Sequence, residues 1–324
     1  MSNENQTETQ EETQEKEGKS QYDRGYRDIF SSKESFTHFL KKYIKMPWTE
    51  EITADDLTQV ESTFVLKTYG KRESDVIYEY KKKKLFFYIL LEQQSKPDFT
   101  MPFRLLHYMV CLLAREFDNA PEEVRTLKEF RLPAVVPIVL YNGEESWTPV
   151  QSFKEYTANH DEFGDYLIDF KYILFDLNRY NEDGILTTYK LLDFVFSMDL
   201  RHNSKDKEDF RRKLRKLAAL QNELTDDDVV KFLAWIINVI FRGKTPHENF
   251  EKEVFDTFRK GDVEKMTHAF DGLLDMEIDS AIEKRLATII KNMLAAGDSV
   301  EKIASATEVP LYRVEELQQG IRPV

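Results

Sequence analysis

The run Leu85–Leu91, "LFFYILL", is the feature that most constrains the fold of this chain. It is made of apolar, β-branched or aromatic residues with no polar break. A strand with one solvated face alternates between apolar and polar residues, whereas an unbroken apolar strand is buried on both faces. Helices must then cover both faces of its sheet, which predicts an α/β fold with a mixed sheet.

An acid and an amide follow this strand, and a second acid precedes the strand before it. Glu92 and Gln94 close the apolar run, and Asp75 opens "SDVIYEY". Residues two apart in a strand share a face, so Glu92 and Gln94 are expected to point together. If the lysine run 81–84 is a hairpin turn, Asp75 comes within reach of Glu92. A carboxylate at the end of a core strand must be paired, solvated or bound to a metal.

Two carboxylates beside an open water position suit Mg²⁺ or Mn²⁺. Such an ion can activate water and bind a phosphodiester oxygen. The alternative is an ordinary hairpin with a solvated acid at each end. The spacing D-x(10–20)-E-x-[KQ] does not by itself decide between a metal site and that hairpin.

Three blocks of the sequence resemble the Rpn / YhgA-like family. They are "SDVIYEY", "YILLEQQSKPDFTMPFRLLHYMV" and "LPAVVPIVLYNGEESWTPVQSF". Members are bacterial proteins described as recombination-promoting nucleases or putative transposases, within the PD-(D/E)xK nuclease superfamily. The resemblance covers Tyr22 to Leu177 well and the helical remainder more loosely. It implies a restriction-endonuclease-like mixed-sheet core that cleaves DNA with a divalent metal.

The resemblance also implies roles for individual residues. Asp75 matches the central aspartate of the superfamily, and Glu92 matches the acid of its E-x-K element. These two would ligate Mg²⁺ or Mn²⁺ together with the backbone carbonyl of Gln93. Gln94 stands where the superfamily has lysine, as is usual in this family. A glutamine supplies no positive charge, so it would orient the attacking water while the metal carries more of the electrostatic stabilisation.

Three further residues are secondary candidates by the same resemblance. The first core helix of such folds often adds an acid to the metal site, and Glu34 and Asp23 are the acids available there. Each could instead be a capping or surface acid. Arg104, on the family's "MPxR" pattern, could clamp a phosphate, orient Glu92, or form an ordinary ion pair.

Length and composition set the organisation of the chain. With 324 residues and 41% hydrophobic residues, it is globular and predicted to hold more than one domain. Residues 1–21 are rich in Glu, Gln and Thr and predict a disordered acidic tail. A nuclease-like domain is expected over residues 22–180 and a helical region over residues 187–324.

Composition also bounds location and partners. No apolar run approaches the ~18 residues of a membrane span, and no secretory signal is apparent. The single cysteine, Cys111, fits a reducing cytoplasm. The net charge of −13 argues against nucleic-acid binding over the whole surface but allows a local basic groove.

Periodicity predicts the other elements of the first part. Ser32 starts a helix whose apolar stripe runs from Phe36 to Ile44, and strands are expected over Leu57–Tyr69, Leu132–Trp147 and Asp169–Leu177. Pro137 predicts an irregular or edge-facing position. After Gln94, Thr100 is expected to cap a helix with Pro102 in its first turn. The face of that helix predicted to pack is formed by Phe103, Leu106, Met109 or Val110, and Leu113. Where the strand of the Leu132–Trp147 segment leaves the sheet, Tyr141 and Asn142 could line a substrate groove or serve only the turn.

From about residue 187 the pattern is helical and predicts a second core. Residues 201–216 carry eight Lys or Arg against three acids, which indicates either a DNA-tracking helix or a solvated helix face. The last segment resembles a helix-turn-helix in which Val300, Ile303 and Ala304 pack against Val309, Val314 and Leu317. Its acidic residues are poor for reading DNA, so packing or self-association is an equal alternative.

The sequence therefore predicts a divalent-metal-dependent DNA endonuclease. The expected partners are DNA and a second copy of the chain, bound through the helical C-terminal region. The competing prediction is a nuclease fold without activity that serves as a regulator or assembly module. A strand-transferring transposase has the least support, because nothing indicates end recognition or joining.

Overall fold

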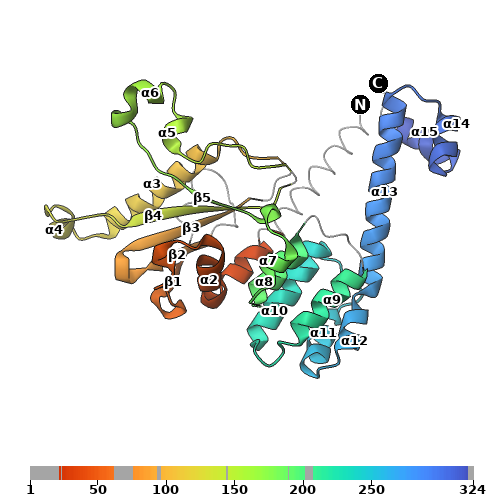
Figure 1. The fold of residues 1–324 in the computed structure, drawn as a ribbon, viewed down its shortest axis with the longest axis horizontal. Helices are drawn as coiled ribbons and strands as arrows, with labels where there is room; N and C mark the ends of the chain where they lie inside the picture. Colours follow the sequence, from red (N-terminus) through yellow and green to blue (C-terminus); the bar gives the residue numbers. More distant parts are fainter. Residues whose placement is uncertain are drawn as a thin grey trace.

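The structure, a computed structural model, describes residues 22, 24–61, 76–92, 96–143, 145–188, 190–200 and 207–319. A five-stranded mixed sheet with helices on both faces is followed by a helical region (Figure 1). The predicted α/β fold, with a mixed-sheet core and a helical C-terminal region, is confirmed. The predicted acidic tail, residues 1–21, lies outside the described residues.

The strands lie in the sheet in the order in which they occur in the chain. The first three are antiparallel neighbours, and the last two run parallel to the third. A parallel neighbour requires a crossover, which the helices between these strands provide. The strands are β1 Leu57–Val60, β2 Val76–Tyr80, β3 Leu85–Glu92, β4 Ala134–Tyr141 and β5 Ile173–Asp176. Of the predicted first strand, residues 62–69 lie outside the described residues.

β2 and β3 form the hairpin that the sequence predicted. Tyr80 pairs with Leu85, and Val76 pairs with Ile89. Residues 81–84 make the turn, in which Lys84 adopts a left-handed φ of 46°. The start of β2 therefore lies beside Ile89, just past the middle of β3.

The lysines of the turn are exposed and bind nearby acids. Lys82 pairs with Asp56 at 2.6 Å, and Lys83 pairs with Glu51 at 2.9 Å. They lie at the end of the hairpin remote from Glu92. This arrangement favours a role in keeping the hairpin turn solvated over phosphate binding at the candidate site.

β3 is buried on both faces from Phe86 to Leu90, as predicted. Phe87 and Ile89 belong to one hydrophobic cluster. The alternate residues Phe86, Tyr88 and Leu90 belong to a second cluster, on the face that α3 (Met101–Asn119) covers. Side chains in a strand alternate between faces, so the unbroken apolar run satisfies two cores at once.

The predicted capping and packing of α3 are partly wrong. Thr100 is the N-cap residue and Pro102 lies in the first turn, but the Thr100 side chain makes no cap. Asp98 instead accepts hydrogen bonds from the Thr100 backbone nitrogen at 2.7 Å and from its hydroxyl at 2.6 Å. The packed face is also different: Phe103 and Val110 are about half exposed, and the residues buried on α3 are Met101, Pro102, Leu105, Tyr108 and Leu112.

Pro137 was predicted to take an irregular or edge-facing position, and on one side of β4 it does. β4 is an interior strand between β3 and β5. The Ala134 nitrogen donates to Lys84 of the β3 side. Successive backbone N–H groups in a strand point to opposite neighbours, so those of residues 136 and 138 point toward β3. The backbone nitrogen of Pro137 points toward the β5 side. Pairing with β5 begins only at Ile138, so the missing N–H of Pro137 removes no bond of the sheet.

Short helices connect the strands of the sheet, and longer helices form the helical region. Before the sheet, α2 Lys33–Phe39 begins at Ser32, whose hydroxyl caps Ser35 as predicted, and continues into a π-helical turn over Leu40–Ile44. The connecting helices are α4 Glu122–Arg125, α5 Phe153–Tyr156, α6 His160–Phe163 and α7 Glu182–Ile185. The later helices are α8 Leu191–Asp199, α9 Lys207–Ala218, α10 Asp226–Trp235, α11 Phe250–Arg259, α12 Val263–Ala269, α13 Asp271–Ala295, α14 Val300–Thr307 and α15 Leu311–Gln319.

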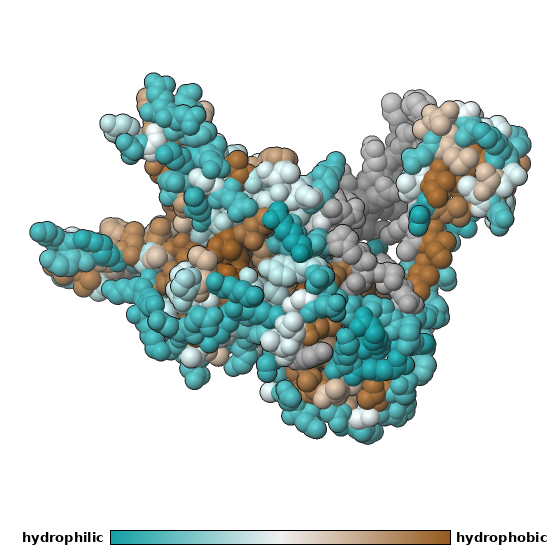
Figure 2. Space-filling model, in the orientation of Figure 1, coloured by the Kyte–Doolittle hydropathy of each residue, from teal (hydrophilic) through white to brown (hydrophobic). Residues whose placement is uncertain are grey.

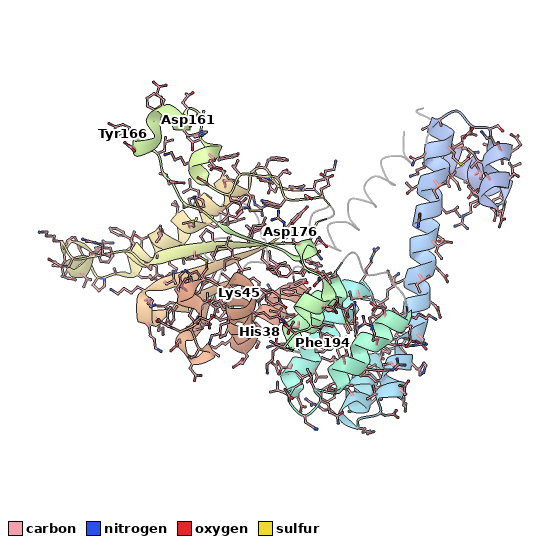
Figure 3. The ribbon with its side chains drawn as sticks, viewed as in Figure 1. His38, Lys45, Asp161, Tyr166, Asp176 and Phe194 are labelled. Atoms are coloured by element: carbon pink, nitrogen blue, oxygen red, sulfur yellow. The ribbon has the colours of Figure 1, made fainter. Side chains whose placement is uncertain are left out.

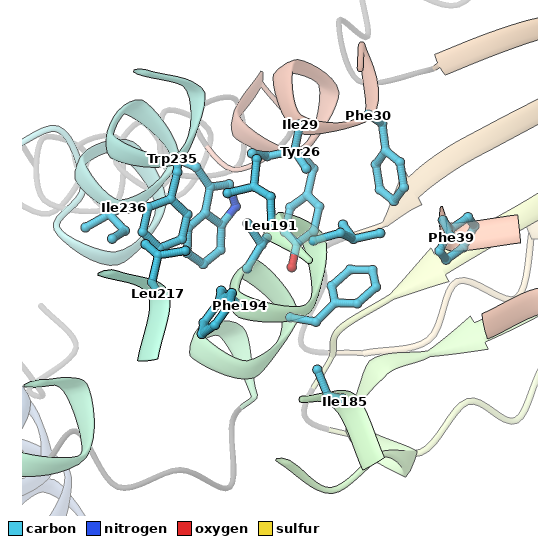
Figure 4. Close-up of a cluster of buried hydrophobic side chains, with 14 of the residues drawn as sticks. Tyr26, Ile29, Phe30, Phe39, Ile185, Leu191, Phe194, Leu217, Trp235 and Ile236 are labelled. Carbon is cyan, nitrogen blue, oxygen red and sulfur yellow. The ribbon is translucent and has the colours of Figure 1, made fainter. Parts of the chain in front are cut away.

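The prediction of a separate second core is wrong. One hydrophobic cluster joins the α2 face of the sheet to the helices α8 to α12 (Figure 4). The ring of Phe196 on α8 lies 5.0 Å from that of Phe175 on β5, and Trp235 on α10 contacts Tyr26 edge-on at 5.9 Å. Val230, predicted to be buried, is 53% exposed. The helical region therefore completes the core of the sheet.

A buried carboxylate joins α2 to α8. Asp193 is fully buried and accepts hydrogen bonds from His38 Nε2 at 2.8 Å and from the Tyr43 hydroxyl at 2.6 Å. It also accepts one from the Thr188 hydroxyl at 2.6 Å and pairs with Lys42 at 2.9 Å. Figure 3 shows His38 and Phe194 at this junction between the sheet part and the helical region.

The end of the described chain projects from the body as an arm. α13 rises from the helical region and carries α14 and α15 at its far end (Figure 1). Figure 2 shows hydrophobic residues, in brown, along the side of α13 that is turned to the viewer. The predicted packing of the last two helices is confirmed, and α13 adds to it: the cluster contains Ile290, Ile303, Val309 and Val314, with Leu286, Met293, Leu294, Val300, Ala304 and Leu317 around them. None of the described helices is long and apolar enough to cross a membrane.

Candidate active site

The carboxyl ends of the three parallel strands meet at one edge of the sheet. Glu92 of β3 pairs with Tyr141 of β4, and Tyr141 pairs with Asp176 of β5. The three positions therefore form one row across the sheet. Ligands in open α/β sheets bind at the carboxyl ends of strands, so this row is the place to look for a site.

The principal predicted residues lie mostly outside the described part of the chain. The structure does not describe Asp23, Asp75, Gln93 or Gln94. It describes the backbone of Glu92 but not its side chain. Val76, the residue after Asp75, pairs with Ile89, three residues before Glu92. The predicted metal ligands therefore belong to chain segments that leave the same end of the hairpin, and their grouping stays a prediction.

Arg104 makes an ion pair with Asp98 in the first turn of α3. Both side chains are largely buried, with 14% of each exposed. Burial alone would raise the pKa of Asp98, but hydrogen bonds from Thr100 and Arg104 outweigh burial and lower it. The ion pair was one of the alternatives that the sequence left open for Arg104. It fixes the guanidinium near the loop that follows β3.

Glu34 is exposed in the first turn of α2 and accepts a hydrogen bond from the Ser32 hydroxyl at 3.1 Å. An acid in this position interacts favourably with the helix dipole. The burial of Tyr78 on β2 raises the pKa of its hydroxyl, and the negative charge of Glu34 adds to the rise. These contacts account for Glu34 as a capping acid.

A polar cluster that the sequence did not predict lies next to this row. Asn142, the residue after Tyr141, is buried and donates from Nδ2 to Asp199 Oδ2 at 2.6 Å. The hydroxyls of Tyr22 and Tyr26 donate to the same oxygen, each at 2.6 Å. Burial, followed by the charge of Asp199, raises the pKa of both tyrosines, so they remain protonated donors. Asn142 therefore serves this cluster as well as the turn.

One sequence signal could have identified Asp199. It is an acid in the last turn of the apolar helix "LLDFVFSMD", where the negative end of the helix dipole disfavours a carboxylate. Such an acid needs donors from elsewhere, and Asn142, 57 positions away, is one of them. The identity of those donors was not readable from local sequence.

Asp176 is a buried acid at this edge of the sheet (Figure 3). It accepts hydrogen bonds from the Asn178 nitrogen and from Arg179 Nε, both at 3.2 Å. Burial raises its pKa although these donors act against the rise. Asn178 Nδ2 donates to the carbonyl of Gly143 at 2.7 Å, which ties the end of β5 to the turn after β4.

The described acidic side chains at this edge could bind a metal ion through carboxylate oxygens. Carboxylates of Asp176 and Asp199 are of the kind that hard cations such as Mg²⁺ and Mn²⁺ take. Among the described residues, no three His, Cys, Asp or Glu side chains gather closely enough to hold a metal ion. Asp75 and the side chain of Glu92 lie outside the described residues, so the metal site stays a prediction.

The basic helix α9 binds acids of its own protein. Arg211 forms a bidentate pair with Asp271, with bonds of 3.1 and 2.6 Å. Arg215 binds Glu208 and Glu264, at 2.8 and 3.1 Å. Its other cations, Lys207, Arg212, Lys213 and Lys216, are each within 4 Å of an acid. These contacts favour a structural role for α9 over a DNA-tracking one.

Replacing Arg211 with alanine is therefore expected to lower stability without changing DNA affinity. The bidentate pair links α9 to the start of α13, so its loss should lower the melting temperature by no more than a few degrees. Thermal melting and a gel-shift titration with plasmid fragments would measure the two effects. Lys216→Ala is the control, because Lys216 lies 3.9 Å from Glu182 and should change neither. A loss of DNA affinity at unchanged melting temperature would contradict this assignment.

The model of the family described as "Putative transposase, YhgA-like" matches residues 20–231. The chain belongs to the YhgA-like putative transposase family. The match contains the sheet, the row at the strand ends, Asn142 and Asp199. Helices α11 to α15 lie beyond the YhgA-like match.

Three curated relatives of this YhgA-like chain come from Escherichia coli. "Inactive recombination-promoting nuclease-like protein RpnE" of strain K12 is 22% identical over 87% of this chain and 84% of its own length. "Recombination-promoting nuclease RpnC" of the same strain is 24% identical over 40% of this chain and 41% of its own. "Recombination-promoting nuclease RpnD" of O157:H7 is 26% identical over 34% and 41%. No solved structure matches the chain significantly.

Proposed function

We propose that this protein is a divalent-metal-dependent DNA endonuclease of the PD-(D/E)xK type that acts in the cytoplasm. The names of its relatives support a nuclease- or recombination-related role. The observation that carries the proposal furthest is the row at the carboxyl ends of β3, β4 and β5, where the Glu92 backbone lies beside buried oxygen-bearing side chains. A single half-buried cysteine, whose pKa is raised by burial, suits a reducing compartment.

In this proposal, Asp75, Glu92 and the backbone carbonyl of Gln93 hold the ion, and Gln94 orients the attacking water. A bound Mg²⁺ or Mn²⁺ would supply an activated water and neutralise charge on the phosphodiester. Asp199, held by Tyr22, Tyr26 and Asn142, would be a positioning residue that fixes the end of β4 against α8. Arg104 would stabilise the loop after β3 through Asp98, within reach of a phosphate.

A second candidate function is that of a nuclease fold without activity, serving as a regulator or assembly module. One observation favours it: the relative that spans 87% of this chain bears the word "inactive" in its name. Gln94 in place of a lysine is a second reason, because it removes a charge that could stabilise the transition state.

Nicking of supercoiled plasmid would test the proposed endonuclease. The wild-type chain is expected to nick the plasmid with Mg²⁺ or Mn²⁺ and to stop when EDTA is added. Asp75→Ala should reduce the rate at least ~100-fold, because removing a metal ligand removes the activated water. Asp55→Ala, an exposed acid on the loop before β1, is the matched control and should cut at the wild-type rate.

Each outcome decides between the candidates. Cleavage that disappears with EDTA and with Asp75→Ala supports the metal nuclease. A folded wild-type protein that fails to nick with either metal supports the inactive module. Equal cleavage by wild type and Asp75→Ala would overturn the assignment of this residue.

A further inference from the structure

α3 has two apolar faces, and the sheet uses one of them. The buried face packs on β3, where Tyr108 stacks on Tyr88 with ring centroids 5.3 Å apart. On the other side of the helix, five large apolar residues follow each other at spacings of three and four. They are Phe103, Leu106, Val110, Leu113 and Phe117, which we call the α3 stripe.

The α3 stripe lies at the surface. Phe103 is 47% exposed and Val110 is 53% exposed, while Leu106 and Leu113 are half-buried. Phe117 is 41% exposed, although its ring contacts Phe130 and the guanidinium of Arg125 in the same chain. Phe99, just before the helix, extends the stripe and is 63% exposed. A surface helix of a monomer has one apolar face and one polar face. A helix that is apolar on two faces needs a second partner.

The spacing identifies the kind of partner. Alternating steps of three and four residues form the seam of a coiled coil, in which each apolar side chain inserts between residues of a facing helix. The stripe spans two heptads of a 19-residue helix, about 28 Å long. We propose that the α3 stripe is a homodimer interface, occupied by the antiparallel α3 helix of a second copy of this chain.

The stripe complements itself in the antiparallel arrangement. A two-fold axis near residue 108 places Phe103 opposite Leu113 of the partner subunit. It places Leu106 opposite Val110 of the partner subunit, and Phe99 opposite Phe117 of the partner subunit. A two-fold interface uses the same surface on both copies, and each of these contacts then occurs twice.

The charges around the stripe do not oppose a second copy. Glu116 is the one acid among the flanking residues, and it pairs with the adjacent Arg115 at 2.8 Å. DNA and an anionic membrane surface would both require lysines or arginines at these edges. The flanking residues are Thr100, Pro102, His107, Met109, Ala114 and Glu116.

The area is adequate for a specific dimer. An aromatic side chain can bury ~150–250 Å² when it is fully covered. Three partly exposed phenylalanines on each copy, together with the aliphatic residues between them, bring the pair close to the ~1,000 Å² that a specific interface needs. The stripe differs from the C-terminal surface that the sequence suggested for self-association.

Analytical ultracentrifugation of the full chain tests the proposal without reference to cleavage. The wild-type protein is expected to sediment as a dimer at micromolar concentration. Phe103→Glu/Val110→Glu should raise the dissociation constant at least ~100-fold, because four buried carboxylates would face an apolar seam. Both residues are exposed in the monomer, and circular dichroism would verify that the variant keeps its fold.

A matched variant on α13 separates this interface from the C-terminal one. Ile282 and Ile289 are 57% and 43% exposed on that helix. Ile282→Glu/Ile289→Glu should leave the dimer intact. A monomeric wild-type protein would overturn the proposal. A dimer that survives the α3 changes and dissociates with the α13 changes would overturn it as well.

Disulfide crosslinking tests the antiparallel arrangement. In a Cys111→Ala background, Phe99→Cys mixed with Phe117→Cys should form a crosslinked dimer under a mild oxidant, whereas each variant alone should not. Efficient crosslinking of either variant alone would indicate parallel helices and contradict the proposed pairing.

Discussion

A chain that ends at Leu186 is expected to lose cooperative folding, although it retains all five strands. The missing part includes Phe196, whose ring packs against Phe39, Tyr43 and Phe175 on the sheet side. It also includes Trp235, which contacts Tyr26. Each large apolar side chain contributes about 1.5–3 kcal/mol by burial, and a domain is stable by only about 5–15 kcal/mol. Removing α8 to α10 exceeds that margin.

A longer truncation provides the control. A chain that ends at Asp279 keeps every residue of the large cluster, whose last member is Leu274. It should melt cooperatively and near the temperature of the full chain. Near-ultraviolet circular dichroism and calorimetry would compare the two truncated chains. A folded, cooperatively melting chain of residues 1–186 would show that the sheet part is an independent domain, contrary to this expectation.

Replacing Asp193 with alanine is expected to be among the most destabilising single changes. The carboxylate is fully buried and accepts hydrogen bonds from His38, Tyr43 and Thr188, while Lys42 pairs with it. Removing one partner of a buried charged network costs about 3–5 kcal/mol, because the other partners stay buried without it. For a chain of 324 residues the melting temperature should fall by about 4–7 °C.

The matched control is Asp183→Ala on the neighbouring helix α7. Asp183 is exposed, so its replacement should change the free energy of unfolding by less than ~0.5 kcal/mol. Urea unfolding of the three proteins at neutral pH would measure the difference. An Asp193→Ala variant as stable as Asp183→Ala would mean that α2 and α8 are held together by apolar packing alone.

The same carboxylate predicts acid sensitivity. Burial alone would raise the pKa of Asp193, but the hydrogen bonds from His38, Thr188 and Tyr43 outweigh it and hold that pKa well below its usual value. A carboxyl with a lowered folded-state pKa stabilises the protein fully above its unfolded pKa of about 3.9, and this contribution declines as the pH falls below that value.

Comparison with Asp193→Asn would isolate this pH effect. The stability difference between wild type and Asp193→Asn should shrink as the pH falls from about 5 to about 3. Urea unfolding at several pH values measures it. A difference that stays constant down to pH 3 would contradict the lowered pKa.

Local sequence was sufficient for the strands and the hairpin but not for every packing partner. The unbroken run in β3 defined a strand buried on both faces, because side chains in a strand alternate between the faces. In α3 the same reasoning failed, since Phe103 and Leu105 start two apolar stripes of similar spacing. Periodicity identifies a face that needs a partner, and the rest of the fold decides which partner that face receives.

In the candidate site, too, local sequence predicted some features, while others depend on residues far apart in the chain. The row at the strand ends follows from the order and direction of the strands, and the role of Glu92, inferred from its place after an apolar run, stays a prediction. Asp199 was missed because its partner Asn142 is 57 positions away and its chemistry depends on that contact. Pro137 pointed to an edge-facing position, but the sequence could not show that this position lies in an interior strand just before β5 begins to pair.

The arm formed by α13 acts as a lever. Its 25 residues make a rod about 37 Å long, and among the described residues the cluster that holds α14 and α15 is completed by α13. A tilt of about 10° at the base would move the far end by roughly 6 Å over that length. Anything that binds both the body and the tip would therefore select one tilt, and anything that fixes the tilt would set the reach of the tip.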